Sequence, residues 1–311
     1  MLFDVIIVGG GPAGLTAAIY SLRAGKKVLL IERMTPGGQV AYTKFVENYT
    51  GIKKIDGAEL SLMMFEHAKS FGLQTVFSDV LDIEIDGKIK KVRTHNGTFE
   101  GKTIILCLGA SAKQLNLPNE RKFVGRGVSY CATCDGNFFK DKTVAIVGGG
   151  NTSLEDCLHL SGLAKKVYLI HRSDCFKGEK ILVDEVTTLS EKQNPVVELL
   201  LSSAVTEIVG EDKVQSIVVK NLKTNEEQNI DVDALFIAIG RKPDTEMLVG
   251  KIDLDEHGYI IANDKMETSI PGVYAAGDVR QKQLRQIVTA ASDGAIASVN
   301  TNDYILKNFG G

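Results

Sequence analysis

The chain has 311 residues, a formal net charge of −3, 44% hydrophobic residues and 24% charged residues. This length suggests about two domains of roughly 150 residues each, and the composition is typical of a soluble globular protein. The slightly acidic balance does not support nucleic-acid binding, which favours a basic surface. The apolar runs are shorter than the ~20 residues of a membrane-spanning helix, and no signal-peptide pattern precedes the first expected strand. We therefore expect a cytoplasmic protein without a membrane segment.

Residues 4–33 predict a strand, a glycine-rich turn, a helix and a second strand, which form a β-α-β unit with a parallel strand pair. In such a turn the first glycine permits the tight bend, and the second lets the backbone approach a pyrophosphate. The third lets helix and strand pack closely, and the phosphates lie at the positive helix N-terminus. The pattern predicts a dinucleotide site at Gly9, Gly11, Pro12, Ala13 and Gly14.

A second copy of the pattern spans residues 143–172 and aligns with residues 4–33 without a gap. A single turn of this type is a weak signal, because a glycine-rich turn need not bind a ligand. Two copies, each between a strand and a helix, favour two dinucleotide sites. The second turn has serine in place of the third glycine and contains Gly148, Gly150, Asn151, Thr152 and Ser153.

The two copies differ at the end of the second strand, where the residue meets the adenosine ribose. The first copy ends in Glu32 and Arg33, and the second in His171 and Arg172. An acid accepts hydrogen bonds from a ribose 2′-OH, which suits FAD or NAD, whereas a cation accommodates a 2′-phosphate of about −1.5 to −2 charges. The second site is therefore predicted to bind NADP. The alternative for Arg172 is a solvated surface arginine.

One close cysteine pair, Cys131 and Cys134, lies just before the second glycine turn. In a reducing compartment such a pair is redox-active or binds metal, and a zinc site needs a second ligand pair that the sequence does not offer convincingly. We therefore predict no metal. A C-x-x-C pair at a helix start has one cysteine of lowered pKa, and Asp135 beside it can move protons or simply cap the helix. The other cysteines are predicted to be buried or without a role: Cys107, Cys157 and Cys175.

Two similar strand ends, at residues 103–110 and 233–243, each lead into a polar stretch. We interpret them as the hinges of an inserted domain. The predicted fold is α/β, with two Rossmann-like dinucleotide-binding domains of the three-layer ββα type, the second inserted into the first. A discontinuous FAD-binding domain is expected at residues 1–113 and 244–311, and an NAD(P)-binding domain with the redox pair at residues 114–243.

From end to end the chain resembles the FAD-dependent pyridine nucleotide–disulfide oxidoreductases, and within them the low-molecular-weight bacterial thioredoxin reductases. The placement of CATCDG just before the second glycine turn is the most specific feature. The motifs that carry the resemblance are GGGPAG (9–14), GGQ (37–39), ENYTG (47–51), CATCDG (131–136), GGGNTS (148–153), HR (171–172), AIGRKP (238–243), AAGD (275–278) and RQIVTAASDG (285–294).

The resemblance implies a homodimer that passes electrons from NADPH to FAD, then to the cysteine pair and to thioredoxin. Cys131 would attack the thioredoxin disulfide, Cys134 would lie against the flavin, and Asp135 would act as the acid–base group. The start of the last helix would face the flavin and stabilise its reduced anion. Further cofactor-binding residues implied by the resemblance are Gly38, Gln39, Asn48, Asp79, Val80, Gly109, Gly240, Arg241, Gly277, Asp278, Arg285, Gln286 and Ile287.

The chain departs from the His-Arg-Arg motif that these reductases use for NADP. Ser173 stands where the second arginine would be, and Lys177 replaces a further arginine. Arginine makes planar bidentate phosphate contacts that serine and lysine cannot copy. NADH or reduced ferredoxin therefore remain alternative electron donors, and a flavin-bound redox sensor without turnover remains an alternative from another class.

Overall fold

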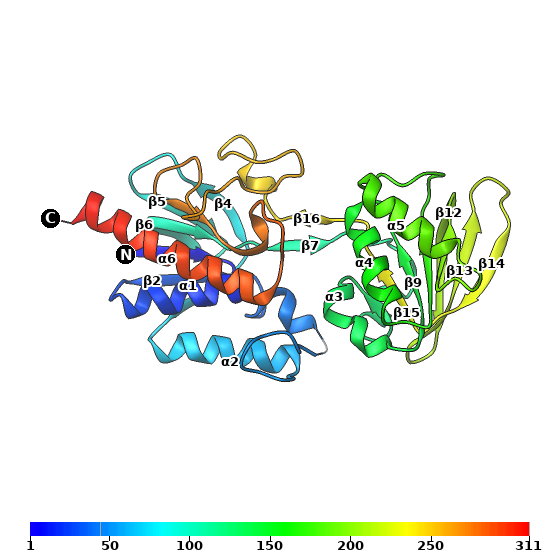
Figure 1. Cartoon of the computed structure of the whole chain (residues 1–311). Helices are drawn as coiled ribbons and strands as arrows, with labels where there is room; N and C mark the ends of the chain where they lie inside the picture. The colour runs from blue at the N-terminus through cyan, green and yellow to red at the C-terminus, as the bar shows by residue number, and fades with distance from the viewer. Residues whose placement is uncertain (44, 311) are drawn as a thin grey trace. The chain divides into compact units, whose positions relative to one another are not determined.

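The structure is a computed structural model and describes residues 1–43 and 45–310 (Figure 1). The chain divides into two compact units. Unit 1 comprises residues 1–111 and 242–311, and unit 2 comprises residues 112–241.

Unit 1 is built on a parallel sheet that continues into antiparallel strands. The parallel strands have the order β3-β2-β1-β6, and the long strand β6 pairs with β17 along its second half and with β5 along its first half. The elements are β1 (Leu2–Val8), β2 (Val28–Glu32), β3 (Gln74–Phe77), β4 (Val80–Glu84), β5 (Lys90–Thr94), β6 (Gly97–Leu106) and β17 (Val273–Ala275).

Two apolar cores cover the two faces of this sheet. One core joins the sheet to the helices α1 (Pro12–Arg23), α2 (Gly57–Ser70) and α6 (Ile287–Phe309), and the other joins it to the antiparallel strands. Small residues let α1 and α6 approach closely, as in the 2.7 Å hydrogen bond between the hydroxyls of Ser21 and Ser298. Short 3-10 helices follow at η1 (Gly38–Tyr42), η4 (Glu246–Leu248) and η5 (Gly277–Val279).

Unit 2 repeats the design with a parallel sheet of order β11-β10-β9-β15-β8. Its helices pack on one face, and a separate antiparallel sheet packs on the other (Figure 1). This layering confirms the predicted pair of Rossmann-like folds. The elements are β8 (Val128–Ser129), β9 (Thr143–Val147), β10 (Lys166–Ile170), β11 (Val197–Leu200), β12 (Ser203–Gly210), β13 (Val214–Asn221), β14 (Glu227–Asp231), β15 (Ala234–Ile237), α3 (Ala132–Asp135), α4 (Asn151–Ser161), α5 (Lys180–Ser190), η2 (Arg121–Phe123) and η3 (Gly136–Phe139).

The two chain segments that connect the units pair with each other as a two-stranded ribbon of β7 (Ala110–Ala112) and β16 (Arg241–Pro243). The backbone N–H of Lys113 donates to the carbonyl of Gly240 at 3.0 Å, which extends this pairing. Among the described residues, no helix combines the length and the apolar character needed to cross a bilayer.

Candidate active site

The first glycine turn leaves no room for side chains at its first and third glycines. Gly9 has a left-handed φ of +104°, and a Cβ there would lie 2.2 Å from the carbonyl oxygen of Cys107. A Cβ on Gly14 would lie 1.9 Å from the carbonyl oxygen of Gly9. Gly11 has ordinary extended backbone, and the nearest atom to a Cβ there is the Cα of Gly38 at 4.0 Å. Of these three glycines, only Gly11 is therefore free of the protein's own packing and can serve ligand approach.

Glu32 ends β2, and two backbone N–H groups hold its carboxylate. The N–H of Gly10 donates to Oε2 at 2.7 Å, and the N–H of Met34 donates to Oε1 at 2.9 Å. The N–H of Ser78 donates to the carbonyl of Glu32 at 2.9 Å, which brings residues 79–80 beside the end of β2. The residues predicted for the adenosine half of a dinucleotide thus lie together within unit 1.

The C-terminal part of the chain reaches the same glycine turn. Gly277 follows β17 with a left-handed φ of +82°, and a Cβ there would lie 2.9 Å from the Cβ of Ala13. Only glycine allows this approach to the first turn of α1. Asp278 is therefore delivered to the start of α1 by a segment far away in the sequence.

A buried carboxylate that sequence reasoning missed holds this segment in place. Asp293 on α6 is only 6% exposed, and its Oδ2 accepts from the N–H of Gly277 at 3.0 Å and from Lys282 Nζ at 2.7 Å. Arg280 lies 3.4 Å from Oδ1. Buried charges require such pairing, and an aspartate within the small-residue run TAASDG was the only sequence signal.

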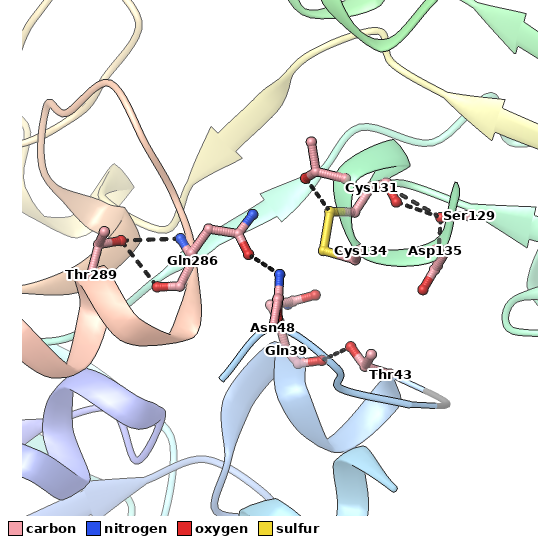
Figure 2. The surroundings of a disulfide bond; sticks show 10 residues. Gln39, Thr43, Asn48, Ser129, Cys131, Cys134, Asp135, Gln286 and Thr289 are labelled. Atoms are coloured by element: carbon pink, nitrogen blue, oxygen red, sulfur yellow. Dashed lines mark hydrogen bonds between the residues drawn. A yellow bond between two sulfur atoms is a disulfide. The ribbon is translucent and has the colours of Figure 1, made fainter. Parts of the chain in front are cut away.

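The start of α6 meets the segment after η1 within unit 1 (Figure 2). Asn48 Nδ2 donates to Gln286 Oε1 at 3.0 Å, and Gln286, the N-cap residue of α6, donates its N–H to Thr289 Oγ1 at 3.1 Å. Gln39 lies in η1, and its carbonyl accepts from Thr43 at 3.4 Å. The predicted contacts Gln39, Asn48 and Gln286 are thus brought together around one helix terminus.

Two predicted residues of unit 1 make other contacts in the structure. Arg33 is exposed and lies 3.7 Å from the carboxylate of Asp244. The guanidinium of Arg285 stacks over the ring of Tyr259 at 4.1 Å, and its Nε donates to the carbonyl of Asp278 at 3.4 Å. Arg285 therefore braces the segment that carries Asp278.

In unit 2, Cys131 and Cys134 form a disulfide across the four-residue helix α3 (Figure 2). The N–H of Cys131 donates to Ser129 Oγ at 3.1 Å, and Ser129 donates its hydroxyl to Asp135 Oδ2 at 2.6 Å. Burial raises the pKa of Asp135, and the hydrogen bond from Ser129 opposes that shift. The side chain of Asp135 makes no capping hydrogen bond, which removes the alternative that it merely caps a helix.

The remaining cysteines behave as expected from their sequence environments. Cys107 and Cys157 are buried, and burial raises the pKa of both thiols, to about 12 for Cys157. They act as small apolar side chains. Cys175 is exposed.

The second glycine turn accommodates its serine by close packing. A Cβ on Gly148 would lie 2.4 Å from the Cβ of Ser153, whose hydroxyl donates to the carbonyl of Gly150 at 2.8 Å. Asn151 binds Glu179 through two hydrogen bonds of 2.7 and 2.8 Å. The start of α4 is thereby tied to the start of α5.

The loop after β10 folds back over this turn. The ring of His171 stacks on Phe176 at 5.6 Å and packs so closely on Gly149 that a Cβ there would lie 2.1 Å from it. Burial lowers the pKa of His171, so the ring is a neutral packing element and not the phosphate-binding cation that was predicted. Lys177 donates its N–H to the carbonyl of Gly149 at 2.7 Å, and both Arg172 and Lys177 have exposed side chains.

The other predicted glycines, Gly109 and Gly240, lie next to the two connecting strands β7 and β16. Arg241 begins β16, and its charge acts on Asp156 of α4. Burial raises the pKa of Asp156 to about 6, the neighbouring charge of Glu155 adds to this shift, and Arg241 opposes it. The start of β16 therefore lies near α4 within unit 2.

Comparison with known proteins agrees with this geometry. A family model described as pyridine nucleotide-disulphide oxidoreductase matches residues 3–294. Thioredoxin reductase of Bacillus subtilis is 43% identical over 306 residues, which cover 98% of this chain and 95% of that protein. The crystal structure of thioredoxin reductase from Streptococcus pyogenes has 41% identity and a TM-score of 0.92, covering 98% of this chain and 99% of that chain.

The chain therefore belongs to the pyridine nucleotide-disulphide oxidoreductase family and is an oxidoreductase with a redox-active disulfide. Its full-length similarity to thioredoxin reductases confirms the resemblance seen in the sequence. A structure described as a ferredoxin-flavin thioredoxin reductase from Clostridium acetobutylicum is also similar, with 31% identity, a TM-score of 0.54 and 99% of each chain covered.

Proposed function

We propose that the protein reduces the disulfide of thioredoxin in the cytoplasm, with electrons passing from NADPH to FAD, then to Cys131 and Cys134, and then to thioredoxin. The observation that carries the proposal is the Cys131–Cys134 disulfide, placed in the unit that also holds the second glycine turn. The full-length thioredoxin reductase relatives support the substrate. The three free cysteines suit a reducing compartment.

We assign FAD to unit 1 because its residues fit a dinucleotide with a free ribose 2′-OH. Gly11 leaves the turn open to a pyrophosphate, and α1 starts without a side-chain cap, so its first N–H groups can bind phosphate oxygens. The carboxylate of Glu32 keeps acceptor capacity beyond its two N–H contacts. When bound, FAD supplies two-electron transfer between a nicotinamide and a disulfide.

The reduced cysteine pair performs two thiol–disulfide exchanges. The Cys131 thiolate attacks one sulfur of the thioredoxin disulfide, which forms a mixed disulfide and releases the other thioredoxin sulfur as a thiolate. The Cys134 thiolate then attacks the Cys131 sulfur, re-forms the enzyme disulfide and releases the second thioredoxin sulfur. Thioredoxin thereby gains two electrons, and Asp135 donates a proton to a released thiolate.

Asp135→Asn should slow this exchange about 10²-fold while flavin reduction by NADPH continues. Because burial raises the pKa of Asp135, its acid form persists to a higher pH than in a free aspartic acid. The rate that depends on this acid should fall as pH rises through the raised pKa, and the Asn variant should lack that limb. Stopped-flow reaction of pre-reduced enzyme with oxidised thioredoxin over a pH series measures both effects.

Ser129→Ala provides the matched variant, since the Ser129 hydroxyl lowers the pKa of Asp135. Its loss should move the same limb to higher pH. If Asp135→Asn retains the wild-type limb, another group supplies the proton.

Arg172→Ala should nearly erase the preference for NADPH over NADH. A charge-assisted hydrogen bond is worth roughly 1.5–3 kcal/mol, so its loss costs about ten- to a hundredfold in affinity for the 2′-phosphate. The wild-type preference should be smaller than with a His-Arg-Arg motif, and Ser173→Arg should increase it. Steady-state kcat/KM with both nucleotides measures these ratios.

The donor comparison also separates the alternative functions. Wild type that uses neither nucleotide, but whose flavin is reduced by reduced ferredoxin, would replace NADPH with ferredoxin as donor; the similar Clostridium acetobutylicum protein keeps this candidate in view. A flavin redox sensor would bind FAD without turning over thioredoxin. The complete cysteine pair argues against that class.

We also propose that the protein is a homodimer. Large apolar side chains are exposed on α1 and α2, with Tyr20 45%, Leu62 59% and Met63 52% exposed. Neighbouring exposed apolar side chains on packed helices favour an interface between subunits.

A further inference from the structure

The loop after β10 carries a negative charge among its positive ones. Asp174 lies between Arg172 and Lys177, and its side chain is 66% exposed. A 2′-phosphate carries about −1.5 to −2 charges at neutral pH. A carboxylate in the loop that binds such a phosphate repels it, so the preference for NADPH depends on how the charge of Asp174 is compensated.

Lys223 supplies an opposite charge to this carboxylate. Its Nζ lies 3.1 Å from Asp174 Oδ2, and this hydrogen bond lowers the pKa of Asp174. Lys223 lies in the turn between β13 and β14, 49 positions further along the chain. The sequence of the loop gave no sign of it.

The backbone fixes the position of this turn relative to the loop. The N–H of Leu222 donates to the carbonyl of Ser202 at 2.6 Å, and the N–H of Ser202 donates to the carbonyl of Ser173 at 2.9 Å. Within the turn, Asn221 Oδ1 accepts from the N–H of Lys223 at 2.8 Å. Two main-chain hydrogen bonds therefore connect Ser173 to the residue next to Lys223, and the ammonium is held near the loop by the fold.

We propose that Lys223 is a specificity-determining residue that neutralises Asp174 and lets the loop hold a 2′-phosphate although Ser173 replaces an arginine. This inference rests on the nucleotide site of the proposed function. NADH has no 2′-phosphate, so Lys223 acts on the use of NADPH and leaves the use of NADH unchanged.

Lys223→Ala should lower the NADPH-to-NADH ratio of kcat/KM about two- to fivefold, the scale of an exposed charge pair. Lys223→Glu should lower it further, to about tenfold. The affinity for 2′,5′-ADP, measured by calorimetry, should fall in parallel while that for 5′-AMP stays constant. The effect should shrink at high salt, because exposed charges are screened.

Lys213→Ala is the matched control, because it removes an exposed lysine in the turn at the other end of β13. It should leave the ratio unchanged. Adding Asp174→Asn to Lys223→Ala should restore the ratio towards wild type, since no carboxylate then needs neutralising.

Equal ratios in Lys223→Ala, Lys213→Ala and wild type would overturn the role of Lys223 while leaving the nucleotide site intact. A double variant no better than Lys223→Ala would overturn the coupling to Asp174. Wild type that binds neither 2′,5′-ADP nor 5′-AMP would instead remove the nucleotide site itself, and the role of Lys223 with it.

Discussion

Serine at either Cys131 or Cys134 should abolish thioredoxin reduction, by roughly 10⁴-fold or more as for other catalytic nucleophiles. Flavin reduction by the donor should remain largely intact in both variants. The reason is that the disulfide accepts electrons after the flavin, and a serine hydroxyl cannot form the mixed disulfide or accept its electrons. Stopped-flow absorbance of the flavin and a steady-state thioredoxin assay measure the two halves separately.

The two variants should also differ from each other. Cys134→Ser keeps the attacking thiol but lacks the one that resolves the mixed disulfide, so it should accumulate a covalent adduct with thioredoxin that mass spectrometry detects. Cys131→Ser should accumulate none. Cys157→Ala, which changes a buried thiol on α4, is the control and should retain turnover. An adduct formed only by Cys131→Ser would exchange the two roles, and turnover in either serine variant would refute the pathway.

Valine at Gly11 should weaken FAD binding roughly 10²-fold, which corresponds to about 3 kcal/mol. The side chain finds space within the protein, because nothing lies closer than 4.0 Å to a Cβ there and the backbone is extended. It would instead occupy the space into which a pyrophosphate must come. The FAD content of purified protein and the melting temperature of the FAD-free form separate the two effects, and only the first should change.

Two other glycines complete this test. Gly14→Ala places a Cβ 1.9 Å from the carbonyl oxygen of Gly9, so it should lower both stability and FAD content. Gly150→Val in the second turn also meets no atom within 4 Å, and it should spare FAD but weaken nucleotide binding. Full FAD content in Gly11→Val would mean that the first turn does not hold the pyrophosphate.

The sequence revealed those features that depend on local pattern. The two glycine turns, Glu32 at a strand end and the C-x-x-C pair are set by spacing within one supersecondary unit, so a short stretch of chain is sufficient to recognise them. The end of β17 was also recognisable, because AAGD resembles a known motif. The left-handed Gly277 explains why that motif requires glycine.

The supporting residues could not be predicted, because distant segments bring them together. Asp293 binds Gly277 across a helix, and Lys223 reaches Asp174 from another sheet. His171 was predicted to help bind a phosphate, but its burial against Gly149 and Phe176 makes it a packing residue. No periodicity in the sequence reports such contacts, since they depend on tertiary packing.

The most direct test of the account is to mix the wild-type flavoprotein anaerobically with a known amount of NADPH and excess oxidised thioredoxin, and to count thioredoxin thiols. We predict that the flavin absorbance is bleached and recovers, and that one thioredoxin dithiol forms for each NADPH consumed, because each step transfers two electrons. A flavin that NADPH leaves oxidised, or that is bleached while thioredoxin stays oxidised, would contradict the proposed path from NADPH through Cys131 and Cys134.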